Sequence, residues 1–342
     1  MTVSGDTSKE KKVETLQVPT FSLRQNRLAK KVTDGSSNGQ GLNCSGSLRS
    51  GAGQAKRVQS LMHGDDGSQK ESLGLIAGRG VYPALVARAA RRAGVDLLST
   101  VAFVGETDPE IEQLSSRVEW LRVGQLGSLL RFFRRSGVSR AIMAGAVAPA
   151  HLFDLRPDLK ALLLLARLKV RNATTIFGAI AEELRGAGVL LLPATTYLED
   201  ELAPAGHFGG PSLRPRQKED GEFGFRMAKE IARLDIGQSL VVKQGTVLAV
   251  EAFEGTDKTL ERGGGLGRGK AVLIKVSKPE QDFRFDVPVI GRQTIEMARR
   301  SGVALIVCEA GKTLILEKEK VVQLAEELGI SLYGMREGGE NA

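Results

Sequence analysis

Short apolar runs alternate with segments of helical length between residues 72 and 192, and this alternation restricts the possible folds more than any other feature. The runs, which we expect to form strands, are 72–77, 95–104, 118–123, 141–145 and 189–192. The segments between them, which we expect to form helices, are 81–92, 127–136, 157–170 and 174–185. Strands and helices in this order predict a parallel sheet covered on both faces, with right-handed crossovers. Residues 71–203 are therefore predicted to form a Rossmann-like α/β domain.

A second α/β domain is predicted for 221–337, although the pattern leaves its topology unclear. Segment 204–220 is rich in Pro, Gly and charged residues without periodicity, which indicates a linker. Gln244-Gly245 between two apolar runs indicates a hairpin. A single helical turn is expected at 256–262, capped by Thr256 and stopped by the glycines at 263–265. The other expected elements are helices at 222–232, 292–301 and 317–328 and strands at 239–243, 246–252, 271–276, 303–308 and 313–316.

The positive charge of the chain is concentrated at its N-terminus. The formal net charge is +8, and residues 1–70 contain eleven Lys and Arg against six Asp and Glu. The first 70 residues thus carry +5 and the remaining 272 carry only +3. Because the folded part is nearly balanced, we expect no nucleic-acid partner. Ser, Gly, Lys, Asn and Gln dominate 1–70, which predicts a disordered tail.

The apolar segments and the cysteines predict a cytoplasmic protein. No apolar stretch reaches the roughly 20 residues of a transmembrane helix. The longest, 159–170, is interrupted by Lys and Arg, and peripheral contact with a membrane stays an open alternative. Cys44 and Cys308 cannot form a disulfide framework, and Cys308 lies in an apolar run, so we expect a buried thiol in a reducing compartment.

Gly78-Arg79-Gly80 follows the first apolar run and precedes a predicted helix. Backbone N–H groups at such a position bind anions, and glycine lets a phosphate approach closely. Gly78, Gly80 and Gly145, which ends the fourth run, are therefore candidate substrate-binding residues. Pro83 occupies the position of the third glycine in a dinucleotide-binding motif, so a tight turn with its own packing is the alternative.

Residues 281–288 combine acidic, basic and aromatic residues in alternation. In an extended chain, Asp282, Arg284 and Asp286 would project from one face and the two phenylalanines from the other. The polar row could hold Mg²⁺ through a carboxylate and a phosphate through the guanidinium group. The alternative is an edge strand with a solvated, salt-bridged face.

A second polar cluster follows the apolar run that begins at Thr246. Glu251, Glu254 and Asp257 lie around Gly255, where we expect the run to end at the ligand-binding edge of a sheet. Asp257 is alternatively a residue that stabilises a helix N-terminus. Lys275 and Lys278, near the end of a later strand, add positive charge suited to phosphate oxygens, although lysines are also common at such surface positions.

Several blocks of this sequence, in order, resemble one family. They are Leu75-Ile-Ala-Gly-Arg-Gly80, Arg233-Leu-Asp-Ile-Gly-Gln238, LAVEAFEGTD at 248–257, KPEQDFRFDVPVIG at 278–291 and Cys308-Glu-Ala-Gly311. The chain resembles the LpxI-type UDP-2,3-diacylglucosamine pyrophosphatases over roughly residues 73–335. The resemblance implies hydrolysis to UMP and 2,3-diacylglucosamine 1-phosphate (lipid X) in lipid A biosynthesis. It also implies Mg²⁺, a homodimer and a UDP-linked diacylated sugar as substrate.

The resemblance places the functionally critical aspartate of the family at Asp286. The catalytic candidates are Asp286, Arg284, Lys278, Glu251 and Glu254, and the metal candidates are Asp286 and Glu251. The further substrate-binding candidates are Gln238, Thr256, Asp257, Lys275, Gln281 and Thr294. An apolar pocket for the acyl chains is expected between the domains or among the C-terminal helices.

One departure from the family pattern keeps two alternatives open. Residues 172–175 read Asn-Ala-Thr-Thr, where family members often carry Gly-Asp-Asp. A non-catalytic nucleotide- or lipid-binding protein is therefore one alternative. A nucleotide-dependent oxidoreductase built on the N-terminal domain is the other, and Pro83 counts against it.

Overall fold

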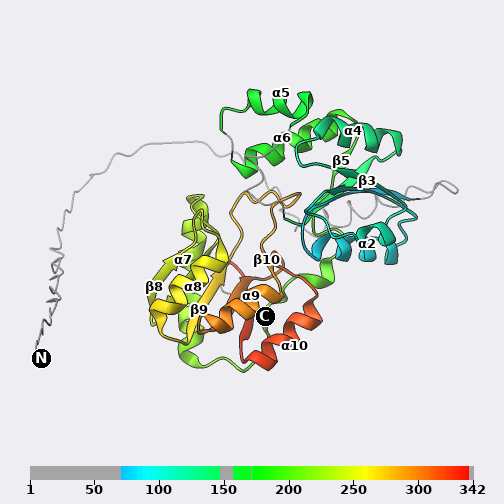
Figure 1. Cartoon of the computed structure of the whole chain (residues 1–342). Coiled ribbons are helices and arrows are strands. Elements are labelled where there is room, and N and C mark those ends of the chain that lie inside the picture. The colour runs from blue at the N-terminus through cyan, green and yellow to red at the C-terminus, as the bar shows by residue number, and fades with distance from the viewer. Residues whose placement is uncertain (1–70, 147–156, 171, 339–342) are drawn as a thin grey trace, which may run out of the picture. The chain divides into compact units, whose positions relative to one another are not determined.

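The first sheet has five parallel strands in the order β3-β2-β1-β4-β5. The structure is a computed structural model, and it describes residues 71–146, 157–170 and 172–338 (Figure 1). The strands are β1 (Ser72–Ala77), β2 (Leu97–Phe103), β3 (Arg117–Leu121), β4 (Arg140–Ala144) and β5 (Leu190–Leu191). The predicted Rossmann-like parallel sheet is confirmed. The predicted disordered tail, 1–70, lies outside the described residues.

Apolar side chains cover both faces of this sheet. Successive residues of β1 alternate, so that Leu75 enters one apolar cluster and Ile76 enters the other. Helix α2 packs on the first face through Val86, and α4 packs on the second through Phe133 (Figure 1). The helices are α2 (Tyr82–Arg92), α3 (Ile111–Leu114), α4 (Leu126–Arg135), α5 (Leu159–Arg167) and α6 (Ala173–Gly186).

The second sheet is mixed, with six strands in the order β6-β13-β11-β9-β7-β8. The central strands β9, β11 and β13 are parallel, whereas β7 runs antiparallel to β8 and β9, and β6 runs antiparallel to β13. The predicted β7–β8 hairpin is confirmed. The strands are β6 (Gly206–Gly209), β7 (Ser239–Lys243), β8 (Thr246–Val250), β9 (Ala271–Lys275), β11 (Val303–Glu309) and β13 (Ser331–Met335). A separate pair of short parallel strands consists of β10 (Val289–Ile290) and β12 (Leu314–Ile315).

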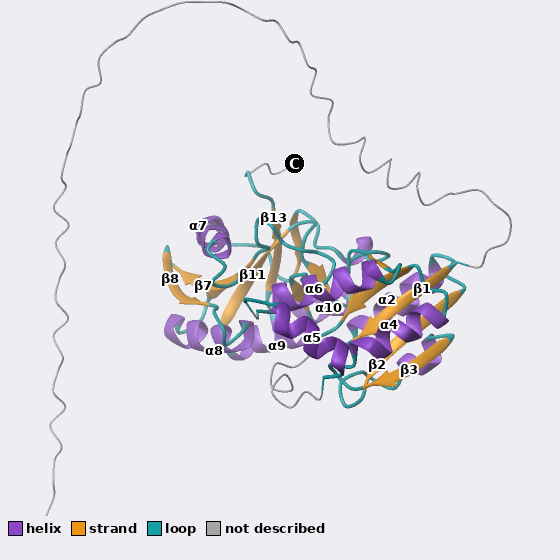
Figure 2. Cartoon of the chain, turned by 90° about the horizontal axis from the view of Figure 1, so that it is seen from above, coloured by secondary structure: helices purple, strands orange, loops and turns teal. Residues whose placement is uncertain are grey.

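Helices cover both faces of the second sheet as well. Helix α7 packs on one face, and α8, α9 and α10 pack on the other (Figure 2). Their bounds are α7 (Pro215–Arg233), α8 (Thr256–Gly267), α9 (Arg292–Arg300) and α10 (Lys318–Leu328), and a short 3₁₀ helix, η2, spans Glu199–Glu201. Cys308 of β11 is fully buried, as expected, and burial raises its pKa to about 12. Within the described ranges, every helix falls short of the length and apolar character that crossing a bilayer requires.

Segment 204–220, which was expected to lack regular structure, contains β6 and the first residues of α7. Strand β6 has the sequence Gly-His-Phe-Gly, and its place is set by backbone pairing with β13 rather than by an apolar pattern. Helix α7 begins at Pro215, seven residues before the expected start, because its first turns are polar and begin with a proline suited to that position.

The expectation that the glycines at 263–265 end a single helical turn is wrong. Helix α8 continues through them to Gly267, and its N-cap is Gly255 rather than Thr256. A Cβ atom on Gly263 would lie 2.5 Å from the Cβ of Val241 in β7, and one on Gly264 would lie 2.0 Å from the carbonyl oxygen of Ser301. These two glycines therefore allow α8 to pack closely against its neighbours, whereas a Cβ on Gly265 would meet nothing within 4 Å.

The two neighbouring glycines should respond oppositely to alanine. We expect Gly263→Ala to lower the free energy of unfolding by about 1–3 kcal/mol, because the added methyl group overlaps Val241. The matched control, Gly265→Ala, should raise it by up to about 1 kcal/mol, since alanine favours the helix and meets no neighbour. Chemical denaturation of both variants measures the difference, and equal effects would contradict the packing role of Gly263.

Candidate active site

Polar residues converge where β8 and β9 end and β7 begins. Because β7 is antiparallel to both neighbours, its first residue, Ser239, lies beside Lys275, the last residue of β9. The backbone N–H of Glu251, directly after β8, donates to the carbonyl of Ser239 at 2.9 Å. Ligands of open α/β sheets bind beyond the carboxyl ends of the parallel strands, and β9 supplies such an end here.

Two adjoining cavities lie at this edge. The first, which we call the Asp286 cavity, has a volume of about 350 Å³. It is lined by Asp235, Ile236, Gly237, Gln238, Glu251, Ala252, Lys275, Lys278, Asp286, Val287, Pro288 and Val289. The second, the Thr256 cavity, has a volume of about 420 Å³. It is lined by Glu254, Gly255, Thr256, Asp257, Lys275, Val289, Gly291, Gln293, Thr294 and Leu316. Lys275 and Val289 line both cavities.

Most of the candidate residues from the second domain lie in these cavities. The Asp286 cavity contains Gln238, Glu251, Lys275, Lys278 and Asp286. The Thr256 cavity adds Glu254, Thr256, Asp257 and Thr294. Arg284 and Gln281 line neither cavity. Asp257 lies in the first turn of α8, in keeping with the alternative role noted for it, and its Oδ2 accepts from Gln293 Nε2 at 2.5 Å.

The predicted strand across 281–288 is wrong, because these residues form a loop with a tight turn. The backbone N–H of Asp286 donates to the carbonyl of Asp282 at 3.0 Å. The Asp282 carboxylate accepts from the backbone N–H of Arg284 at 3.2 Å and from the Arg284 guanidinium at 2.7 Å. Asp282 thus stabilises a turn that an alternating strand excludes. Arg284 is paired within the loop, and it does not project beside Asp286.

Several polar groups hold Asp286 in its cavity. Gln238 Nε2 donates to Asp286 Oδ2 at 3.4 Å, and Gln281 Nε2 donates to the backbone carbonyl of Asp286 at 2.8 Å. The backbone N–H of Lys278 donates in turn to Gln281 Oε1 at 2.8 Å. The ammonium group of Lys278 forms an ion pair with Asp235. Gln281 therefore shapes the loop that carries Asp286 without lining the cavity itself.

Burial and charge set the protonation of the central groups. Burial raises the pKa of Asp286, and the positive charge of Lys278 opposes that rise. Desolvation lowers the pKa of Lys275, and the charges of Glu251, Asp257 and Asp286 counter it in part. The Asp286 carboxyl is consequently a better proton acceptor, when ionised, than an ordinary aspartate.

A chain of hydrogen bonds joins the two cavities. Lys275 Nζ donates to Thr256 Oγ1 at 3.1 Å, and Thr256 Oγ1 donates to Glu251 Oε1 at 3.0 Å. The other oxygen of Glu251 accepts from the hydroxyl of Ser239. Glu254 is held separately by Arg262 at 2.6 Å, and its pKa is lowered by a backbone hydrogen bond and by Arg262.

The donor set suits a magnesium ion that is bound together with a phosphate. Among the described residues, no group of three or more His, Cys, Asp or Glu side chains could hold a metal. Glu251 and Asp286 nevertheless line one cavity together. Mg²⁺ is commonly bound through one or two carboxylates, substrate phosphates and water rather than by a complete protein cage. The two carboxylates fit that arrangement.

The candidate glycines of the first domain are explained by close backbone packing. A Cβ on Gly78 would lie 2.7 Å from the carbonyl oxygen of Ala146, and one on Gly145 would lie 2.8 Å from that of Arg79. The backbones of Arg79 and Ala146 exchange hydrogen bonds of 2.7 and 3.1 Å. Gly80 has a φ of 92°, which favours glycine. This geometry accords with the tight-turn interpretation.

The first domain also contains an apolar cavity of about 340 Å³. Phe285, from the loop that carries Asp286, is one of its lining residues and contacts the ring of Phe177 with centroids 5.7 Å apart. The other apolar lining side chains are Ile76, Phe103, Val123, Leu126, Leu129, Met143, Ala144, Ala146, Pro157, Ala161, Leu164, Leu165, Ile176 and Ile180, and Gly78 and Gly145 also lie on its wall. The sequence predicted an apolar pocket either between the domains or among the C-terminal helices, and no helix of the second domain lines this cavity.

Asn172, at the departure from the family pattern, caps α6 by accepting from the backbone N–H of Thr175 at 2.9 Å.

Three residues that shape the Asp286 cavity were not among the candidates predicted from the sequence. Asp235 pairs with Lys278, and Ser239 holds Glu251. Gly237 is required because a Cβ there would lie 2.0 Å from the carbonyl oxygen of Glu251. Asp235 and Gly237 belong to the block 233–238 that contributes to the family resemblance, and this block could have identified both residues from the sequence.

Comparison with known proteins gives a consistent result over both domains. Residues 72–201 match the model of the LpxI N-terminal domain, and residues 204–333 match that of the LpxI C-terminal domain. A relative from Caulobacter vibrioides, named UDP-2,3-diacylglucosamine pyrophosphatase LpxI, is 34% identical over 274 residues, which cover 77% of this chain and 97% of the relative.

Similarity to solved structures is low. A biotin carboxylase subunit of pyruvate carboxylase matches with a TM-score of 0.19 and 14% identity, over 52% of this chain and 35% of that one. The protein gox2253 matches with a TM-score of 0.24 and 13% identity, over 78% of this chain and 90% of that one. Neither similarity bears on the site.

The raised pKa of Asp286 should appear as a cost to stability. Because the folded-state pKa is above the unfolded one, wild-type protein loses stability as the pH rises through that pKa. We expect the Asp286→Asn variant to melt a few degrees higher than wild type at neutral pH and to lose this advantage in acid. Thermal unfolding across a pH series, without added divalent cations, measures the difference.

Asp282→Asn is the matched control, and its change in melting temperature is expected to have the opposite sign. Hydrogen bonds from Arg284 lower the pKa of Asp282, so its carboxylate stabilises the fold above the unfolded pKa and loses that effect in acid. This variant should melt below wild type at neutral pH. Shifts of the same sign in both variants would contradict the assignment.

Proposed function

The chain belongs to the LpxI family, and we propose that it hydrolyses the pyrophosphate of UDP-2,3-diacylglucosamine to UMP and 2,3-diacylglucosamine 1-phosphate in lipid A biosynthesis. The observation that carries this proposal is the Asp286 cavity, where a carboxyl group of raised pKa lies with two further carboxylates, of Asp235 and Glu251, and with two lysines. The alignment with this chain covers 97% of the length of a relative whose name states that activity.

Lys275 and Lys278 supply positive charge for the pyrophosphate. Both line the Asp286 cavity, and 24% of the Lys278 side chain is exposed. Its partner Asp235 is 59% exposed, so the ion pair can open to admit a phosphate at little cost. Fixed positive groups stabilise the charge that builds on phosphoryl oxygens during transfer, and this effect dominates in phosphoryl-transfer enzymes.

Asp286 is the proposed general base. The oxygen of a water molecule forms a bond to phosphorus as the phosphoanhydride bond breaks, and the departing phosphate keeps the bridging oxygen. Asp286 takes the proton of the attacking water, and its raised pKa favours this transfer. Gln238 and Gln281 hold the carboxyl group and its backbone in place.

Glu251 is fixed by Ser239 and Thr256, so it faces the cavity in one orientation. A Mg²⁺ ion held by Glu251 and the substrate phosphates would supply further positive charge at the phosphate oxygens and leave the Asp286 carboxylate free to take the proton. Glu254 remains a catalytic candidate on the wall of the Thr256 cavity. Arg284 would have to leave Asp282 before it could contact a phosphate.

The apolar cavity of the first domain is the proposed site for an acyl chain. Its wall consists mainly of aliphatic and aromatic side chains, and burying each methylene group of a fatty acyl chain contributes about 0.8 kcal/mol. Phe285 lines this cavity while the next residue, Asp286, lines the polar one. A homodimer and peripheral contact with a membrane remain predictions.

Replacement of Asp286 tests the proposed chemistry. We expect Asp286→Ala to reduce the rate of UMP release from UDP-2,3-diacylglucosamine by at least about a hundredfold, since it removes the base. The assay is run with and without Mg²⁺, and greater activity with Mg²⁺ is expected. Asp96→Asn, an exposed aspartate of the first domain, is the control and should keep wild-type turnover. Near-normal turnover in the Asp286→Ala variant would defeat the assignment.

Filling the apolar cavity tests the acyl site. Ile180→Trp places a larger side chain in the cavity wall, so we expect kcat/KM for the diacylated substrate to fall about tenfold, a typical effect of a changed apolar pocket. A UDP-glucosamine derivative with short acyl groups should be affected much less. Thr174→Trp, at an exposed position of the same helix, is the control. Equal losses for long and short chains would exclude the cavity as the acyl site.

A further inference from the structure

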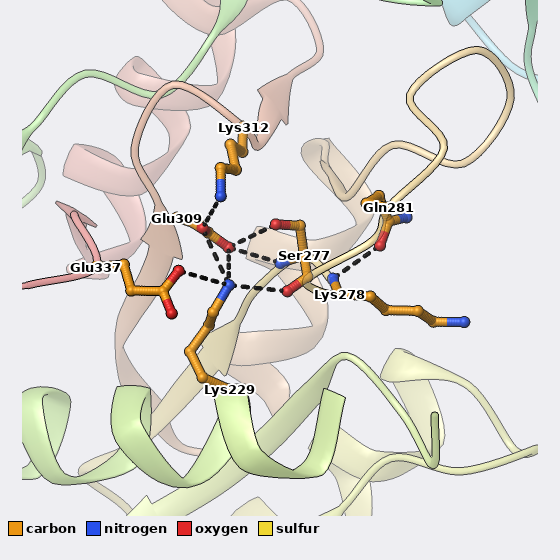
Figure 3. A network of polar contacts seen from close by, with 7 residues as sticks. All are labelled: Lys229, Ser277, Lys278, Gln281, Glu309, Lys312 and Glu337. Carbon is orange, nitrogen blue, oxygen red and sulfur yellow. Dashed lines mark hydrogen bonds and ion pairs between the residues drawn. The ribbon is translucent and has the colours of Figure 1, made fainter. Parts of the chain in front are cut away.

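A buried ion pair lies at the end of β11 and outside both polar cavities. Lys229 of α7 and Glu309, the last residue of β11, are separated by 3.2 Å, and their side chains are only 10% and 2% exposed (Figure 3). Lys312 Nζ donates to Glu309 Oε1 at 2.7 Å. Burial raises the pKa of Glu309, but hydrogen bonds from Lys312 and Ser277 and the charge of Lys229 outweigh it, so the pKa lies below its usual value.

The ion pair holds one residue, Ser277, through all of its polar groups. The backbone N–H of Ser277 donates to Glu309 Oε2 at 2.8 Å, and its hydroxyl donates to the same oxygen at 2.7 Å. Its carbonyl accepts from Lys229 Nζ at 3.1 Å. Ser277 is fully buried and follows β9 by two residues. Glu309 and Lys229 therefore fix the direction in which the chain leaves the sheet.

The segment that leaves Ser277 carries the proposed catalytic groups. Lys278 is the next residue, and its backbone N–H donates to Gln281, as Figure 3 shows. Gln281 donates in turn to the backbone carbonyl of Asp286. Glu309 is thus connected to the backbone of Asp286 by the hydrogen bonds of Ser277, the peptide bond from Ser277 to Lys278, and the hydrogen bonds of Gln281.

We propose that Lys229 and Glu309 are positioning residues for the hydrolysis, acting through Ser277 to place Lys278 and Asp286. The inference rests on the proposed function of the Asp286 cavity. Replacing a buried ion pair with apolar residues is often neutral or stabilising, so stability alone gives little reason for this pair. A loop without strand pairing, such as 281–288, needs an anchor if its carboxylate is to stay in place, and a displacement of about 1 Å can cost a hundredfold in rate.

Glu309→Gln is the principal test variant, and Asp220→Asn is its matched control. Asp220 is also a buried carboxylate, 4% exposed, and it lies on the same helix as Lys229. It accepts from the backbone N–H groups of Gln244 and Gly245 at 2.8 and 2.7 Å, in the β7–β8 turn, so it holds a backbone segment away from the 276–288 loop.

Two measurements on the full-length chain separate positioning from general stability. The first is steady-state hydrolysis of UDP-2,3-diacylglucosamine below the melting temperature. We expect Glu309→Gln to lower kcat by about tenfold to a hundredfold with KM changed less than about threefold, and Asp220→Asn to leave both unchanged. The second is amide hydrogen exchange of the peptide 276–288, which should become faster in Glu309→Gln only.

The two measurements distinguish a failure of the proposed function from a failure of the positioning role. If the wild-type chain does not hydrolyse the substrate, the proposed function fails, while the exchange data still show whether the pair anchors the loop. If wild type is active and Glu309→Gln matches Asp220→Asn in kcat or in exchange, the positioning role is overturned. Should Glu309→Gln not fold, the double variant Lys229→Met with Glu309→Leu removes both charges together, and the same losses are expected from it.

Discussion

The partial burial of the Asp286 carboxyl is the constraint on which the candidate site depends. Its burial raises the pKa, and the surrounding polar groups limit that effect: Lys278 by charge and Gln238 by a hydrogen bond. Gln238 lies directly before β7, and Lys278 lies three residues after the end of β9, so the two groups come together only when the mixed sheet has formed.

The first domain could be predicted from the sequence, whereas much of the second could not. Runs such as 72–77 are apolar because a parallel strand is buried on both faces, and that pattern is visible locally. The mixed sheet depends on pairings between distant segments, and β6 has no apolar pattern at all. The glycines at 263–265 predicted a helix end, but α8 continues through them, and Gly263 and Gly264 allow close contact with Val241 and Ser301, which no local pattern reveals.

The candidate site was predictable in its residues more than in its geometry. Acidic and basic residues near strand ends, such as Glu251 and Lys275, were chosen as candidates from the sequence, and they line the same cavity in the structure. Alternation at 282–286 suggested a strand, but Asp282 bonds to the residues that follow it and turns the chain instead. The pair of Lys229 and Glu309 is separated by 80 positions in the chain, so its partnership appears only in the fold.

Phe285 and Asp286 are joined by a single peptide bond, yet their side chains line cavities of opposite character. On the proposed function, an acyl chain of the substrate contacts Phe285 while its pyrophosphate contacts Asp286. Two adjacent residues of this chain therefore bind the two ends of the substrate. On this proposal, the free energy gained by burying the acyl chain can help to position the Asp286 carboxylate at the phosphate. Binding of the lipid then contributes to the rate of hydrolysis as well as to affinity.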